Sequence, residues 1–220
     1  MVYEKEVVEN TINFVKKELQ GAEGGHDWWH IYRVWNLSKN ICLNEKADLL
    51  IVELSALLHD IADSKFNNGD EEIGPKKAKE FLLTQNLQES VIEHVEKIIK
   101  NISFKNSFDS NLNKFSSIEL QIVQDADRLD AIGAIGVART FNFGGFKQRE
   151  LYNPNVKPNL KMSKEEYKNS NSPTINHFYE KLLLLKDKMN TKTGKDMAQK
   201  RHEFMELFLE EFYLEWDGKR

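Results

Sequence analysis

Hydrophobic residues recur at intervals of three and four along most of the chain, which is the period of an amphipathic helix. A clear example is the stripe Val34, Leu37 and Ile41, which continues N-terminally to His30. The same period predicts helices over about 7–19, 27–43, 46–62, 75–84, 91–99, 118–139, 175–189 and 194–216. No stretch of strand length alternates with a period of two. The pattern therefore predicts an all-α fold.

Glycine and proline mark where several of these helices begin, end or bend. The segment Gly21–Gly25 ends the first helix, and Pro75 suits the first turn of the fourth. The helix over 118–139 is expected to be continuous, with a bend near Gly133 or Gly136 if it bends at all. The two closing helices carry many apolar residues that suit packing onto the core, so we expect a helical bundle with a C-terminal helical extension.

Two polar stretches interrupt the helical pattern. Ser103–Asn113 is expected to be a loop. Asn142–Asn176 is longer, contains three prolines, and includes a capping box at Ser163–Glu166 that predicts a short helix. A long insertion of this kind is either a functional lid or a disordered connector, and the sequence leaves both open.

Composition limits the classes of function. The chain has 220 residues and a net charge of −4, so we expect one domain over 1–220, with the chemistry-bearing core at about 20–140 and the loop-rich insertion and closing helices at about 141–220. The acidic balance argues against a partner that is nucleic acid or an anionic membrane. No signal peptide or membrane-spanning run is evident, and the single cysteine, Cys42, reads as a packed thiol. A cytoplasmic monomer or homodimer is expected.

The candidate chemistry centres on adjacent His59 and Asp60, near the end of the apolar run Leu49–Asp63. Burying ionisable groups is costly unless each has a partner. His30 and Asp127 fall on the apolar stripes of two other predicted helices, so their side chains should also point inward. Imidazoles and carboxylates are the ligands of hydrolytic divalent metals, and one ion would provide a partner for every group. The alternative for each histidine alone is a hydrogen-bonded core residue.

Three segments around these residues resemble the HD-domain phosphohydrolases, an all-α superfamily named after an adjacent His-Asp pair. The segments are HDWWHIYRV from His26, HDIAD from His59 and DADRLDA from Asp125. The resemblance covers roughly 25–138 and implies that His30, His59, Asp60 and Asp127 are the metal ligands. The closing segment from His177 to Glu203 looks like the bacterial branch related to nucleotide pyrophosphohydrolases.

The implied ligand set of two neutral imidazoles and two carboxylates favours one divalent ion, Mn²⁺ or Mg²⁺ first and Co²⁺ or Ni²⁺ next, over a closed zinc site. Because His59 and Asp60 are consecutive, one of them should approach the ion from a distorted last turn. His94 is expected to be a surface or core residue, so the site is expected to be mononuclear.

Asp63 is the candidate general acid or orienting group, since it lies one turn after Asp60, and the resemblance places an acidic residue at this spacing. Its alternative is a solvated helix-end carboxylate. Phosphate binding needs cations or N–H donors. The candidates for substrate contact are His26, Asp27, Lys65, Arg128 and Lys181. Asp27 could instead be a helix N-cap, Arg128 could support a ligand carboxylate, and Lys181 could serve helix packing.

The resemblance and the chemistry together predict a metal-dependent phosphohydrolase acting on nucleotides. The expected reaction cleaves a (deoxy)nucleoside triphosphate to a monophosphate and pyrophosphate, with a metal-activated water as nucleophile. The alternatives are a nucleoside monophosphatase, a phosphodiesterase, and a non-catalytic nucleotide-sensing protein.

Overall fold

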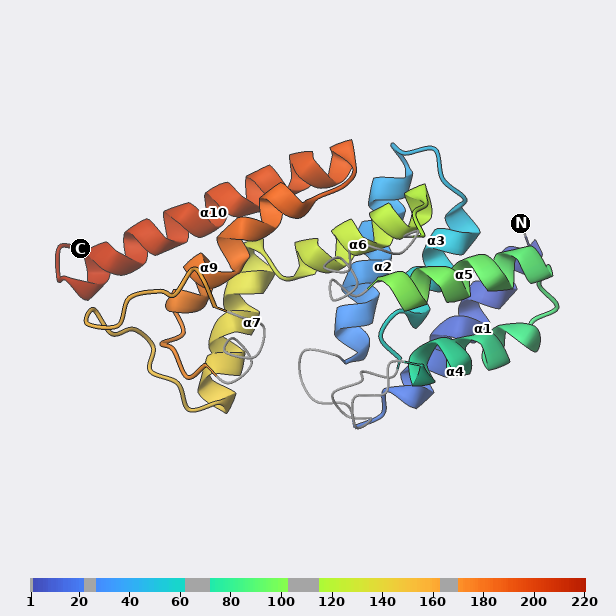
Figure 1. The fold of residues 1–220 in the computed structure, drawn as a ribbon, viewed down its shortest axis with the longest axis horizontal. Coiled ribbons are helices and arrows are strands. Elements are labelled where there is room, and N and C mark those ends of the chain that lie inside the picture. The colour runs from blue at the N-terminus through green and yellow to red at the C-terminus, as the bar shows by residue number, and fades with distance from the viewer. Residues whose placement is uncertain (1, 22–26, 62–71, 103–114, 163–169) are drawn as a thin grey trace. The chain divides into compact units, whose positions relative to one another are not determined.

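The computed structural model describes residues 2–21, 27–61, 72–102, 115–162 and 170–220, and its regular elements in these ranges are all helical (Figure 1). The prediction of an all-α fold is therefore confirmed. The predicted loop Ser103–Asn113 and the capping box Ser163–Glu166 lie outside the described residues. No helix among the described residues is long and apolar enough to cross a membrane.

The chain divides into two compact units, Met1–Asp127 and Arg128–Arg220, and each is described by itself. The expectation of one domain over the whole chain stays a prediction. The first unit contains the following helices: α1 (Val2–Glu18), α2 (Trp28–Cys42), α3 (Leu49–Leu58), α4 (Ile73–Leu83), α5 (Glu89–Asn101) and most of α6 (Ile118–Asp130).

Helix α3 is the centre of the first unit. Its sequence LLIVELSALL is apolar on nearly every face, as expected for a helix surrounded by others, and it contacts α1, α2 and α5. Leu54, Leu57 and Leu58 are completely buried, together with Ile31 of α2 and Val95 of α5. These apolar contacts fix the position of the last turn of α3, and the His59–Asp60 pair follows directly after its final residue, Leu58.

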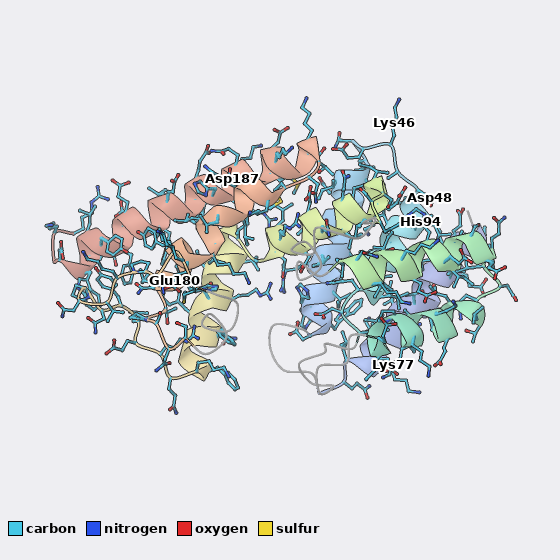
Figure 2. The ribbon with its side chains drawn as sticks, viewed as in Figure 1. Lys46, Asp48, Lys77, His94, Glu180 and Asp187 are labelled. Atoms are coloured by element: carbon cyan, nitrogen blue, oxygen red, sulfur yellow. The ribbon has the colours of Figure 1, made fainter. Side chains whose placement is uncertain are left out.

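A polar contact joins α5 and the start of α3 to α6 (Figure 2 labels His94 and Asp48). The Nε2 atom of His94 lies 3.0 Å from Ser117 Oγ and 3.4 Å from Glu119 Oε2. The backbone N–H of Asp48 donates to Glu119 Oε1 at 3.1 Å, and Ser117 Oγ accepts from the backbone N–H of Leu120. The first turn of α6 is thereby fixed to two neighbours. His94 thus supports the packing of α5 against α6, and its place outside the metal site stays a prediction.

Cys42 is buried, and burial, followed by the nearby carboxylate of Glu119, raises the pKa of its thiol. A thiol in such surroundings stays protonated and unreactive near neutral pH. The interpretation of Cys42 as a packed thiol is confirmed.

The second unit contains α7 (Gly133–Phe146), α9 (Asn176–Glu180), the 3-10 helix η2 (Leu182–Lys188) and α10 (Lys192–Trp216). Thr191 caps α10 by accepting the backbone N–H of Gly194 at 2.9 Å. The core includes stacked rings of Phe178 and Phe208, whose centroids are 5.7 Å apart, with Phe141 against both. Helix α10 contacts both α7 and η2, so it holds the unit together along its length.

The prediction of one helix over 118–139 is wrong, because the chain breaks into α6 and α7 between Asp130 and Gly133. Gly133 has φ +75°, a left-handed conformation that interrupts a right-handed helix and that glycine adopts without penalty. The break is supported by two arginines: Arg139 donates to the carbonyl and carboxylate of Asp130, and Arg201 of α10 donates to the carbonyl of Leu129.

The helix expected over 175–189 is also divided. Lys181, with φ −144° and ψ −57°, separates the short α9 from η2. In addition, α7 extends to Phe146, so the irregular segment starts later than the predicted Asn142, and α3 ends at Leu58 instead of reaching Ala62. Periodicity places helices well, but it does not register single residues that leave the helical conformation.

The break at Gly133 provides a stability prediction. Alanine at position 133 would have to keep the left-handed backbone conformation, and its Cβ would lie 2.9 Å from Cγ of Arg201. Gly133→Ala should therefore lower the free energy of unfolding by about 1–2 kcal/mol. Gly145→Ala is the matched control, since its Cβ would meet no atom within 4 Å and alanine favours a helix. Urea unfolding followed by circular dichroism measures both. Equal stability of the two variants would contradict the strain at Gly133.

Candidate metal centre

His30 enters the site from the first turn of α2. Asp27 is the N-cap of this helix, and its carboxylate accepts the backbone N–H of His30 at 2.9 Å. The cap fixes the helix start, and the apolar stripe through Val34 turns the His30 side chain inward, where it is 3% exposed. The capping alternative for Asp27 is thus observed, while its contact with substrate stays a prediction.

His59 enters from the turn that ends α3. Its Nδ1 atom lies 2.8 Å from the carbonyl oxygen of Ala56. A carbonyl only accepts, so Nδ1 is the donor, and in the neutral ring Nε2 then carries the lone pair. This is the tautomer that metal-binding histidines take, with one nitrogen held by a hydrogen bond and the other facing the ion.

Asp127 provides the carboxylate that both histidines face. Its Oδ1 lies 3.6 Å from His30 Nε2 and 4.0 Å from His59 Nε2. The two imidazoles meet edge to face, with ring centroids 5.4 Å apart. All three side chains offer donor atoms within 4.8 Å of one another. Helices from three separate parts of the sequence therefore converge on one point.

The geometry fits a metal ion better than direct hydrogen bonding. At 3.6 and 4.0 Å the histidine–carboxylate pairs are too long for hydrogen bonds. Donors that share one ion at about 2.0–2.2 Å lie roughly 3–4 Å from each other, which matches this spacing. The histidine side chains are almost fully buried, whereas that of Asp127 is 45% exposed, so one side of the centre remains accessible.

Asp60 is not in this group of converging donors, although it follows His59 directly in the same turn. Helix α3 ends before the pair, as expected for two consecutive residues that cannot share one helical direction. Its role as the fourth ligand stays a prediction. Asp63, Lys65 and His26 lie outside the described residues, and their assigned roles likewise stay predictions.

Arg128 and Lys181 both belong to the second unit. Arg128 donates through Nη1 to the carbonyl of Lys188 at 2.6 Å, which supports the end of η2. Lys181 is exposed at the junction of α9 and η2. The contact of Arg201 with the end of α6 had no signal in the local sequence, because its partner lies 72 residues away.

Comparison with known families and proteins agrees with this geometry. The HD domain family matches residues 28–132, the range that contains all three converging donors. The chain is 37% identical over 206 residues to the protein YpgQ of Bacillus subtilis (strain 168), covering 93% of this chain and 91% of YpgQ.

Solved structures are similar over nearly the whole chain. An HD-superfamily hydrolase from Bacillus thuringiensis has 43% identity and a TM-score of 0.79, with 97% of this chain and 98% of that chain covered. Bacillus subtilis YpgQ in complex with ADP has 35% identity and a TM-score of 0.74, with 96% and 95% covered.

Proposed function

This chain belongs to the HD-domain superfamily of hydrolases, and we propose that it is a metal-dependent phosphohydrolase that converts a (deoxy)nucleoside triphosphate to the monophosphate and pyrophosphate. The observation that carries the proposal is the convergence of His30, His59 and Asp127 on one point, with each histidine Nε2 facing the same carboxylate oxygen. Asp60 is proposed as the fourth ligand.

The donor set indicates which ions it would hold. Two neutral imidazoles with carboxylate oxygen suit Mn²⁺ or Mg²⁺, and also Co²⁺ or Ni²⁺. When bound, such an ion supplies Lewis-acid chemistry, lowering the pKa of water and offsetting charge on a phosphate oxygen. Ala56 contributes by holding the His59 ring in the ligating tautomer through its carbonyl.

Asp63 is proposed to hold and move the proton. It follows Asp60 by three residues, so it would act beside the ligand turn. A carboxylate there can accept a proton from the attacking water or hold that water in line with the scissile bond.

A nucleotide is the proposed substrate for two reasons. YpgQ, a similar protein, has been solved in complex with ADP. A triphosphate also needs several cations beyond the metal to offset its negative charge, and we propose that Lys65 and Lys181 supply them. Further contacts with the substrate are proposed for His26, Asp27 and Arg128.

The bond that is cut can be tested with isotopic water. In H₂¹⁸O with Mg²⁺ and a deoxynucleoside triphosphate, attack at the α-phosphorus places ¹⁸O in the monophosphate and leaves the released pyrophosphate unlabelled. Mass spectrometry of both products is the measurement. Labelled orthophosphate released from nucleoside monophosphates, with triphosphates left intact, would instead establish a monophosphatase.

The proposed cations provide a separate test. Lys65→Ala and Lys181→Ala should each lower kcat/KM for the triphosphate by about 10- to 100-fold, the scale of one lost charge-assisted contact, and should lower any monophosphate activity less. Lys46→Ala is the matched control, because Lys46 is an exposed lysine in the connection before α3 (Figure 2). A loss in the control equal to that in the variants would show a general effect of charge.

A further inference from the structure

The C-terminal end of α6 is held by residues that come later in the chain. The ends of helices are prone to fray, because the last four carbonyl groups have no N–H partner within the helix. In α6 these are the carbonyls of residues 127–130. Asp127, one of the three converging donors, therefore stands in the turn that a helix by itself restrains least. Contacts that hold this turn also limit where the Asp127 carboxylate can lie.

The backbone supplies part of the missing hydrogen bonds. The Arg128 carbonyl accepts the N–H of Ala131 at 3.1 Å, and the Leu129 carbonyl accepts the N–H of Ile132 at 3.2 Å. The Leu129 carbonyl also accepts from Nη1 of Arg201 in α10, so both of its lone pairs are used. An arginine from the far end of the chain thus completes the hydrogen bonding at the end of α6.

A second arginine holds the last residue of α6. The Nη1 atom of Arg139 in α7 donates to the Asp130 carbonyl at 3.2 Å and to the Asp130 carboxylate at 2.5 Å. The carboxylate is 1% exposed, and a buried charge is tolerated when a close partner of opposite charge offsets its desolvation. Backbone and side chain of Asp130 are therefore bound by one guanidinium.

Arg201 reaches the end of α6 across the break at Gly133. A Cβ at position 133 would lie 2.9, 3.0 and 3.3 Å from the Cγ, Cβ and Cδ atoms of Arg201, so the missing side chain lets the arginine stem pass this close. Burial lowers the pKa of the Arg201 guanidinium and the Asp130 carboxylate opposes that shift, and the group stays charged at pH 7. A positive charge at the C-terminal end of a helix is stabilised by the helix dipole.

We propose that Arg201 and Arg139 are positioning residues, which hold the last turn of α6 and with it the Asp127 carboxylate in the geometry that metal binding needs. The path is short, because Asp127 lies two residues before Leu129 and three before Asp130 in the same helix. Functional sites need their groups held within about 0.5 Å of the productive geometry. The inference rests on the proposed function in taking Asp127 as a metal ligand.

The affinity for Mn²⁺ tests this role without any substrate. Arg201→Met keeps an apolar stem beside Gly133 but has no donor for the Leu129 carbonyl. Its Mn²⁺ affinity, measured from the EPR signal of the free ion, should fall by roughly 10- to 100-fold, the scale for residues that support metal ligands. Arg201→Lys can still donate an N–H to that carbonyl, so its affinity should lie between those of Arg201→Met and the wild type.

A control separates positioning from a general loss of stability. Leu209 is buried about two turns further along α10, so Leu209→Ala should destabilise the protein through lost packing and keep the wild-type affinity for Mn²⁺. Circular dichroism shows which variants are folded at the temperature of the titration. Wild-type affinity in folded Arg201→Met, or an equal loss of affinity in Leu209→Ala, would overturn the proposal. If Arg201→Met does not fold, wild-type affinity in Arg201→Lys overturns it.

Hydrogen exchange provides a second measurement that needs no metal. The N–H of Ile132 donates to the carbonyl that Arg201 also contacts, so it reports on the end of α6. In the metal-free protein this N–H should exchange faster in Arg201→Met than in the wild type, by on the order of 10-fold, because local opening becomes easier. It should exchange at the wild-type rate in Leu209→Ala. Unchanged exchange in Arg201→Met would contradict the restraint on this turn.

The results also distinguish this role from the proposed function. A wild type that binds Mn²⁺ more tightly than Arg201→Met does, but cleaves no nucleoside triphosphate, would contradict the proposed function and leave the positioning role intact. Triphosphate cleavage by the wild type together with unchanged Mn²⁺ affinity in Arg201→Met would do the reverse. A wild type that binds no divalent ion would overturn both.

Discussion

Replacement of His59 by asparagine is expected to remove the bound metal and the hydrolytic activity together. Asparagine can keep the hydrogen bond to the Ala56 carbonyl through its amide N–H, but it lacks the Nε2 lone pair that faces Asp127. Losing even an outer partner of a metal ligand typically costs 10- to 100-fold in affinity, so losing the ligand itself should lower affinity and turnover by more than roughly 100-fold. Elemental analysis, metal titration and kcat/KM measure the effect.

The matched control for this variant is His94→Ala. His94 is a histidine of the same unit whose ring contacts Ser117 and Glu119, and it is not in the converging group. It should retain stoichiometric metal and activity, with at most a modest loss of stability. Circular dichroism should show unchanged helical content in His59→Asn. Wild-type metal affinity in that variant would remove His59 from the ligand set.

Asp63→Asn is expected to have the second large effect, and it should separate chemistry from metal binding. If Asp63 holds or moves a proton, asparagine should slow turnover by on the order of 10²–10⁴-fold, the usual contribution of a positioned acid or base. Metal content should stay stoichiometric. The dependence of kcat/KM on pH should also lose the limb that belongs to the Asp63 carboxyl.

Asp187→Asn serves as the control for charge, because Asp187 is an exposed carboxylate on η2 (Figure 2). It should hydrolyse the substrate as the wild type does, with the same pH profile. Wild-type turnover in a metal-loaded Asp63→Asn protein would assign Asp63 to a solvated helix-end role.

The sequence determined the class of fold and three members of the candidate metal centre. Helical periodicity placed His30 and Asp127 on the buried faces of their helices, and a side chain in phase with Val34 or Val123 must point into the same core as those residues. His59 was a candidate because it stands beside an apolar run with Asp60, and the resemblance to the HD-domain phosphohydrolases implied that it is a ligand. Local periodicity and the cost of burying polar groups favoured inward-pointing ionisable side chains, and the resemblance to the HD-domain phosphohydrolases implied that these residues share one metal.

The tertiary structure decided what depends on partners distant in sequence. The helix predicted over 118–139 is interrupted at Gly133, and the adjacent carbonyl of Leu129 accepts a hydrogen bond from Arg201 of α10. It also assigned Arg128 to the carbonyl of Lys188. A sequence shows which side chains are basic or acidic, but the atom that each one meets is fixed by packing. Contacts between residues 60 or more positions apart leave no periodic trace in either segment.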